Sequence, residues 1–144
     1  MRTTDDLTAR IGYQLQVTNL HLMERSRVAL APFGITPARV TAMVLIRENE
    51  GCDQSALGRA LSINRASAMK LVNALAEVGF VERRSGRDLR SNALHLTPTG
   101  RSRLTEMLAA LDAVEDAYVG ALSSTERATL RDLLDKLRTA GEGV

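Results

Sequence analysis

Apolar residues recur at helical spacing from Asp5 to about Ala31. One stripe, mostly apolar, contains Leu7, Ile11, Leu15, Thr18 and Leu22, and a second contains Tyr13, Val17 and Leu20. Residues three or four positions apart share one face of a helix, so the two stripes occupy different faces. A helix with two apolar faces packs between two partners, and the pattern therefore predicts a first helix that contacts more than one part of the molecule.

Capping residues divide the next part of the chain into three shorter helices. They are expected from Thr36 to about Glu48, from Asp53 to Ala60, and from Asn64 to about Val78. Thr, Asp and Asn side chains accept hydrogen bonds from the free N–H groups of a first turn, and Pro37 fits the turn that it begins. Gly79 is the C-terminal signal of the last of these helices.

A hairpin and two further helices follow. Phe80–Arg84 and Ala93–Thr97 read as short strands around a polar tip at 85–92, with His95 on the outer, solvated side. Thr97-Pro98 begins a long helix, and the Ser123–Glu126 segment, S-x-x-E, forms a capping box that opens the last one. The apolar positions on these helices are Leu104, Met107, Leu108, Leu111, Val114, Tyr118, Leu130, Leu133, Leu134 and Leu137.

This order of elements predicts a mostly α (α+β) fold, a winged helix-turn-helix with an α-helical dimerisation region. Aromatic residues make up only 3% of the chain and Trp is absent, so aliphatic residues and Met must form the core. We expect an N-terminal dimerisation helix at 1–34, a winged lobe at 35–100 and C-terminal dimerisation helices at 101–144. Eight apolar residues of the last two helices are expected in an intersubunit core: Leu104, Met107, Leu108, Leu111, Leu130, Leu133, Leu134 and Leu137.

Positive charge is concentrated in the middle of the chain, although the net charge is only +2. The segment from Arg59 to Arg90 contains seven basic residues (59, 65, 70, 83, 84, 87 and 90) and three acidic ones (77, 82 and 88). From Pro98 onward the balance is reversed, with six basic and eight acidic residues. A basic segment in a nearly neutral chain indicates that one face of the protein meets phosphate.

The helix that begins at Asn64 has the surface that the major groove of double-stranded DNA requires. Its expected buried face is Ala68, Leu71, Val72 and Leu75, and its outer face carries Ala66, Ser67, Met69, Lys70 and Asn73. Short side chains permit close approach, and Lys70 suits base edges or phosphates. Asn73 suits bases or backbone, and replacing Ser67 or Asn73 is expected to alter sequence preference. Arg65 in the first turn is expected near phosphate. A solvated helix face without a ligand is the competing interpretation.

The hairpin favours the DNA-binding interpretation. Four arginines, Arg83, Arg84, Arg87 and Arg90, crowd one short β-turn-β unit. Arginine at a wing tip can enter the minor groove, where the potential is most negative. Asp88 lies two residues before Arg90, and a carboxylate there can orient the guanidinium through paired hydrogen bonds.

The sequence resembles the MarR family of bacterial regulators. The resemblance is carried by Leu75, Gly79, Phe80, Val81 and Arg83, by Asp88 and Arg90 in the wing, and by Leu94, Leu96, Thr97 and Gly100 after it. The segments "GITPAR" from Gly34 and "LSSTERATLRDLL" from Leu122 also look like the family. The resemblance implies a homodimer formed by the first and last two helices. It also implies a repressor of palindromic operators that a small phenolic or aromatic acid releases.

Residues for an effector site are less well defined by the sequence. Tyr13, His21 and Arg25 lie on the first helix, and Arg39 and Met43 lie on one side of the second. The two arginines could pair with an anionic ligand, such as an aromatic carboxylate or its coenzyme A thioester. Surface or interface salt bridges are an equally good interpretation of these arginines.

Other functional classes lack their motifs. The chain has no P-loop, no G-x-G-x-x-G, no G-x-S-x-G and no His or Cys set at metal-ligand spacing, so we expect neither an enzyme nor a cofactor nor a metal site. No apolar run approaches the length of a membrane span, so a cytoplasmic protein is expected. Oxidation-sensing relatives carry a cysteine near the start of the first helix, whereas Cys52 lies elsewhere and is interpreted as a spectator thiol. The rival hypothesis is a winged-helix protein-interaction module without specific DNA binding.

Overall fold

The computed structural model describes residues 5–85 and 92–141. The elements in chain order are α1 (Asp5–Thr8), α2 (Ile11–Leu30), the 3-10 helix η1 (Ala31–Phe33), α3 (Pro37–Glu48), α4 (Gln54–Ala60), α5 (Arg65–Glu77), β1 (Val81–Ser85), β2 (Asn92–Leu96), α6 (Pro98–Tyr118) and α7 (Ser124–Gly141). Helices followed by one hairpin and two more helices confirm the predicted mostly α, winged helix-turn-helix fold.

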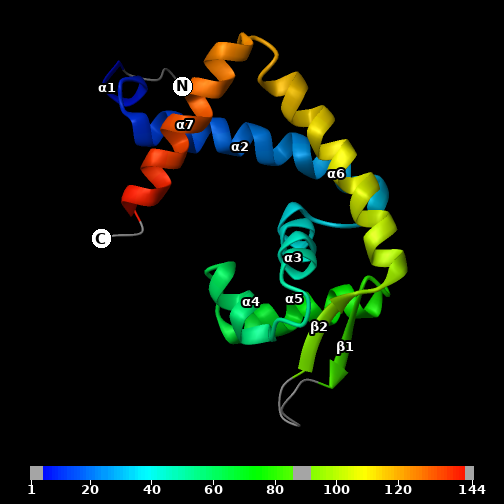
Figure 1. Ribbon diagram of the computed structural model, residues 1–144. Coiled ribbons are helices and arrows are strands. Elements are labelled where there is room, and N and C mark those ends of the chain that lie inside the picture. The colour runs from blue at the N-terminus through cyan, green and yellow to red at the C-terminus, as the bar shows by residue number, and fades with distance from the viewer. Residues whose placement is uncertain (1–4, 86–91, 142–144) are drawn as a thin grey trace.

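Two regions share the long helix α6 (Figure 1). The winged lobe consists of α3, α4, α5, the hairpin and the N-terminal half of α6. The helical arm consists of α1, α2, the C-terminal half of α6 and α7. Helix α2 packs against α6 and against α3, so it contacts both regions. The stripe residues Ile11, Leu15 and Leu20 are nevertheless exposed in the single chain. After α6 the chain turns back as α7 (Figure 1).

The expected single helix from Asp5 to Ala31 is wrong in one respect, because the chain breaks between α1 and α2. Arg10 has an extended backbone, with φ −87° and ψ 122°, and precedes the first turn of α2 without a side-chain cap. The side chain of Gln14 donates a hydrogen bond of 2.6 Å to the carbonyl of Thr8, at the end of α1. A local side-chain contact of this kind stabilises the break, and apolar spacing alone does not reveal it.

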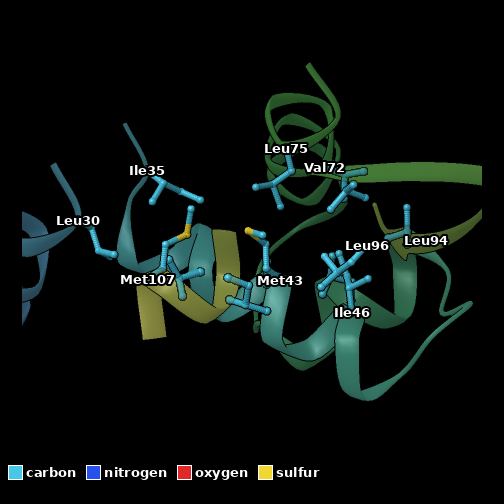
Figure 2. Packing of buried hydrophobic residues seen from close by; sticks show 14 residues of the cluster. Leu30, Ile35, Met43, Ile46, Val72, Leu75, Leu94, Leu96 and Met107 are labelled. Carbon is cyan, nitrogen blue, oxygen red and sulfur yellow. The ribbon is translucent and has the colours of Figure 1, made fainter. Parts of the chain in front are cut away.

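The hydrophobic core belongs to the winged lobe and to the elements that join it. Figure 2 shows side chains from α2, α3, α5, β2 and α6 converging there, with Leu30, Met43, Ile46, Leu75, Leu94 and Met107 all fully buried. Leu104 is also fully buried in this core. The prediction that Leu104 and Met107 contribute to an intersubunit core is therefore wrong, because the single chain already covers both side chains.

Strand β2 pairs on both of its edges. Strands β1 and β2 are antiparallel, with Val81 opposite Leu96 and Arg83 opposite Leu94. On the other edge, Leu94 accepts a hydrogen bond of 3.0 Å from the Gly51 amide and donates one of 2.9 Å to the Cys52 carbonyl. The loop before α4 thus ties the base of the hairpin to the helix-turn-helix.

The expectation that His95 is solvated is wrong. Its side chain is only 19% exposed, and Nδ1 lies 2.6 Å from Oε2 of Glu50. Glu50 also accepts a hydrogen bond from the Arg101 guanidinium at the start of α6. Since Glu50 lies in the loop that pairs with β2, this polar cluster covers the outer face of the hairpin and holds loop, strand and helix together.

Most of the predicted helix caps are confirmed. Asp53, Asn64 and Thr97 accept hydrogen bonds from backbone amides three residues later. The capping box is also confirmed, because the Ser123 amide donates to Glu126 at 2.8 Å and the Glu126 amide donates to Ser123 Oγ at 3.3 Å. Hydrogen bonding of the Glu126 carboxylate to the Ser123 backbone amide, and then to the Ser123 side chain, holds the pKa of Glu126 below its ordinary value. Thr36 is the exception, since its side chain makes no capping bond although Pro37 begins α3 as predicted.

Gly100 allows α6 to approach the hairpin. A Cβ atom at this position would lie 2.1 Å from the carbonyl oxygen of Phe80, a distance that no side chain can occupy. The adjacent Thr97 hydroxyl donates to the Gly79 carbonyl at 2.6 Å. Hairpin and α6 therefore meet at a close backbone contact that fixes the direction of both.

Candidate nucleic-acid interface

Helices α4 and α5 are joined by a tight turn that sets the angle between them. Ser62 has a positive φ of 53°, and the Ile63 amide donates a hydrogen bond of 3.0 Å to the Gly58 carbonyl. A Cβ atom at Gly58 would lie 3.3 Å from Cβ of Ala68, so a glycine here permits α4 to pack closely on α5. This turn presents α5 as the outer helix of a helix-turn-helix.

The outer face of α5 is exposed as predicted. Ala68, Val72 and Leu75 are buried and Leu71 is half-buried, which confirms the inner face. The exposed residues of the predicted outer face and its cap are Asn64, Arg65, Ala66, Ser67, Met69, Lys70 and Asn73, and Glu77 at the end of the helix is exposed as well. Within the described residues, neither Arg65 nor Lys70 forms an ion pair. Two cations on a surface of short side chains are thus available to a polyanion.

The first turn of α5 is fixed by its own cap. The Asn64 carboxamide oxygen accepts a hydrogen bond of 2.8 Å from the Ser67 amide. That oxygen is therefore engaged within the protein, and the amide nitrogen of Asn64 is the part of the side chain that remains for a ligand. The positive end of the helix dipole at this turn also favours a phosphate.

The hairpin contributes arginines from both of its faces. Arg83 Nη2 donates a hydrogen bond of 2.6 Å to Oδ1 of Asn73 on α5. Arg84, on the opposite face of β1, donates through Nε to Glu82 at 2.8 Å. Sequence reasoning placed both arginines at the interface but missed these two partners. Arg87, Asp88 and Arg90, the predicted wing-tip residues, lie outside the described residues.

The predicted effector residues fall into two groups. His21 and Arg25 line a shallow pocket at the crossing of α2 and α6, together with Glu24 and Tyr118. The Arg25 guanidinium lies 5.3 Å from the centre of the Tyr118 ring, and Tyr118 donates a hydrogen bond of 3.1 Å to the Thr18 carbonyl. Sequence reasoning did not select Tyr118, because its position against α2 depends on how two distant helices cross.

The other effector residues lie away from this pocket. Tyr13 is half-buried two turns earlier on α2, and Arg39 is half-buried in α3. Met43 lies in the hydrophobic core and is completely buried. The structure therefore brings together His21 and Arg25 but not the whole predicted set.

Glu24 brings negative charge to the same pocket. Its hydrogen bond from Arg27 lowers the pKa of the carboxyl, so it remains ionised at neutral pH. Arg27 pairs with Glu24 at 2.7 Å, so Arg27 largely balances the charge of Glu24 and Arg25 is not needed for that. Arg25 itself is exposed, and its guanidinium lies over the Tyr118 ring.

Two further sequence expectations concern chemistry and membranes. In the described ranges, no three His, Cys, Asp or Glu side chains are grouped closely enough to hold a metal ion. Over the same residues, no single helix is long and apolar enough to cross a membrane, and the one pair that would be, Ile11–Phe33 with Pro37–Glu48, is bent by 77°.

Comparison with known proteins places this geometry in context. A sequence profile of the MarR family matches residues 33–91, which include the helix-turn-helix and strand β1. A protein assigned as a transcriptional regulator of the hcr operon in Thauera aromatica is 32% identical over 133 residues, covering 91% of this chain and 80% of the relative.

Solved structures agree with the sequence matches. The transcriptional repressor CouR bound to a 23-mer DNA duplex superimposes with a TM-score of 0.89, at 26% identity, over 96% of this chain and 99% of CouR. CouR from Rhodococcus jostii RHA1 bound to p-coumaroyl-CoA superimposes with a TM-score of 0.80, at 25% identity, over 93% of this chain and 95% of that protein. The same fold therefore occurs in a DNA complex and in a coenzyme A thioester complex.

Proposed function

Because this chain belongs to the MarR family of transcriptional regulators, we propose that it is a repressor that binds a palindromic operator as a homodimer and is released by a small anionic effector. The family and the relatives are transcription regulators and not enzymes. The observation that carries the proposal is the exposed outer face of α5 beside the arginines of β1. A similar fold binds a DNA duplex in CouR.

The proposed homodimer rests on the exposed apolar residues of the helical arm. Leu130, Leu133, Leu134 and Leu137 on α7 and Ile11, Leu15 and Leu20 on α2 are all exposed in the single chain. A second copy would cover them and would place two α5 helices about 34–36 Å apart, as two half-sites one DNA turn apart require.

The effector proposal starts from Arg25 and Tyr118. A guanidinium beside an aromatic ring suits a ligand with an anionic group and a flat ring, such as an aromatic carboxylate or its coenzyme A thioester. Helix α2 contacts both regions, so the packing of α2 against α6 affects the spacing of the two α5 helices in the dimer. A ligand at the crossing of α2 and α6 changes that spacing if it binds more tightly to the conformation with one spacing than to the conformation with another. Arg39 is the second proposed anion contact.

DNA binding is tested by selecting binders from a randomised duplex library. We expect a palindromic consensus, and we expect the affinity for it to fall steeply with salt because phosphate contacts release counterions. Ser67→Ala is expected to alter the selected sequence, whereas Arg65→Ala is expected to weaken binding to every sequence. A chain with neither sequence preference nor salt dependence would instead be a protein-interaction module.

The effector is tested by a thermal-shift screen of aromatic acids and their coenzyme A thioesters, followed by DNA-release assays on the hits. Arg25→Ala and Arg39→Ala are expected to bind DNA normally and to lose the response. Arg47→Ala is the matched control, because Arg47 lies on α3 like Arg39 but pairs with Glu48 and does not line the pocket. Equal responses from all three variants would place the anion contact elsewhere, and a broad screen without DNA release would contradict the effector proposal.

A further inference from the structure

The hydrogen bond between Arg83 and Asn73 joins two elements of the proposed DNA interface. In an antiparallel pair, opposite residues point to the same face of the sheet, and Val81, Leu94 and Leu96 are buried on the core face. Arg83 belongs to this face but is exposed, so its side chain passes the rim of the core and reaches the outer face of α5.

The bond changes what Asn73 can offer to DNA. Reading adenine requires the amide oxygen as an acceptor and the amide nitrogen as a donor at the same time. The Asn73 oxygen already accepts from Arg83 at 2.6 Å, and a bond to a charged donor is among the stronger ones. Arg83 thus uses one of the two lone pairs of the Asn73 oxygen, whereas the remaining N–H groups of Asn73 and Arg83 are all donors. The pair therefore favours a partner rich in acceptors, which means phosphate oxygens or the O6 and N7 atoms of guanine.

The position of Asn73 along α5 favours phosphate. Asn73 is eight residues after Arg65, which corresponds to about 12 Å along a helix, and the major groove is about 12 Å wide. Recognition helices contact bases mainly through their N-terminal residues. When Arg65 lies at the phosphates of one wall and Ser67 meets the bases, Asn73 and Arg83 reach the far wall of the groove, where the backbone lies.

We propose that Asn73 is a positioning residue that holds the Arg83 guanidinium against a backbone phosphate of the operator. The inference rests on the proposed DNA binding and specifies how one part of it works. Asn73 then contributes affinity for all sequences and reads no base. Arg84 provides the comparison, because it is the next residue in β1 but points to the other face and pairs with Glu82.

The salt dependence of binding distinguishes this role from base reading. Asn73→Ala removes no charge, yet it is expected to weaken operator binding about tenfold. It is also expected to lower the slope of log affinity against log salt by up to about 0.9 for each of the two half-sites, the value for one phosphate contact. Arg83→Ala is expected to lower the affinity and the salt slope by similar amounts. The variant that carries both Asn73→Ala and Arg83→Ala is expected to bind no more weakly than Arg83→Ala alone. Asn73→Ala combined with Arg84→Ala is expected to show the product of the two separate effects.

Modified operators distinguish the two possible acceptors. A methylphosphonate at the contacted phosphate is expected to lower the operator affinity of the unmodified protein, but not to lower the affinity of the Arg83→Ala variant any further. Replacing guanine with 7-deazaguanine is expected to show no such dependence on Arg83. Coupling to 7-deazaguanine instead, or an Asn73→Ala variant with an unchanged salt slope and an altered base preference, would overturn the inference alone. Absence of salt-dependent DNA binding by the unmodified protein would overturn the proposed function as well.

Discussion

The winged lobe and the helical arm differ in how far they bury similar aliphatic side chains. In the lobe, Met43, Ile46, Leu75 and Leu94 are all completely buried within one chain. In the arm, α7 has no buried residue, and its four leucines on one face are between 41% and 53% exposed. The lobe closes its own core, whereas the arm presents an apolar face that only another molecule can cover.

The difference assigns separate tasks to the two regions. A closed core holds α5 and the hairpin in a fixed relation, which reading one DNA half-site requires. In the proposed homodimer, an open apolar face makes the arm depend on association, so a ligand or a mutation there is expected to act on the distance between half-sites. If this comparison is right, changes in the arm alter assembly and changes in the lobe alter the stability of each chain.

The largest expected effect comes from introducing charge into the arm. Leu133→Glu with Leu137→Glu is expected to convert the dimer to a monomer at micromolar concentration. Each leucine that becomes buried contributes about 1.5–3 kcal/mol, and a two-fold symmetric interface contains every position twice. Operator affinity is expected to fall at least about 100-fold, since a monomer contacts only one half-site. Sedimentation velocity and DNA titration measure the two effects.

Ala128→Glu is the matched control for this change, because residue 128 lies on the opposite side of α7 from the leucine face. It is expected to remain a dimer with ordinary affinity. A monomer that still binds the operator tightly after the leucine substitutions would contradict the role given to the arm.

A cavity in the lobe is expected to have the next largest effect. Leu75→Ala removes a completely buried side chain of α5 and is expected to lower the free energy of unfolding by about 2–5 kcal/mol. Urea unfolding of the variant and of the parent at one protein concentration measures it. The dissociation constant of the dimer is expected to stay the same, because the arm is untouched. A large change in dimer dissociation would show that the two regions are not energetically separate.

Features that depend on residues close together in the sequence, such as helix caps and helix faces, could be predicted from the sequence. The caps at Asp53 and Asn64 and the exposed face of α5 follow from spacing and from side-chain chemistry within one or two turns. Leu104 shows where this reasoning fails. Its apolar position was recognised, but whether its cover comes from the same chain or another depends on the path of α6, which local spacing does not contain.

Contacts between distant residues could not be predicted for the same reason. Glu50 meets His95 across 45 positions, and Arg25 meets Tyr118 because α2 crosses α6. The Arg83–Asn73 bond spans only ten positions, but it depends on the register of the hairpin and on its packing against α5. The candidate DNA surface was therefore identified as a set of residues, while the partners of those residues required the fold.

A smaller effect is expected at the joint between the hairpin and α6. Gly100→Ala places a methyl group against the Phe80 carbonyl, and relief of that overlap requires backbone movement that we expect to cost about 1–3 kcal/mol. Operator affinity is expected to fall because the hairpin shifts relative to α5. Thermal unfolding and DNA titration check both results.

Gly12→Ala in the arm is the matched control for this substitution. Apart from its chain neighbours and the backbone of its own helix, no atom of the described residues lies within 4 Å of a Cβ at Gly12. Alanine stabilises a helix relative to glycine by about 0.5–1 kcal/mol. The same chemical change is thus expected to destabilise the lobe and to be neutral or stabilising in the arm. Similar losses at both positions would mean that the joint at Phe80 has no special role.

The smallest effect is expected at Cys52, the only cysteine of the chain. The thiol is half-buried at the edge of the lobe, and burial, followed by the negative charge of Asp53, raises its pKa. Because the thiolate is the reactive form, reaction with a disulfide reagent at pH 7.5 is expected to be at least about threefold slower than that of free cysteine. The rate is expected to keep rising with pH above about 8.5, the ordinary thiol pKa, because the folded chain holds its proton more tightly. Cys52→Ser is expected to leave DNA affinity unchanged, and peroxide is expected to release neither protein from the operator. Rapid peroxide-dependent release that Cys52→Ser abolishes would contradict this and would give the lobe a sensing role that the comparison assigns to the arm.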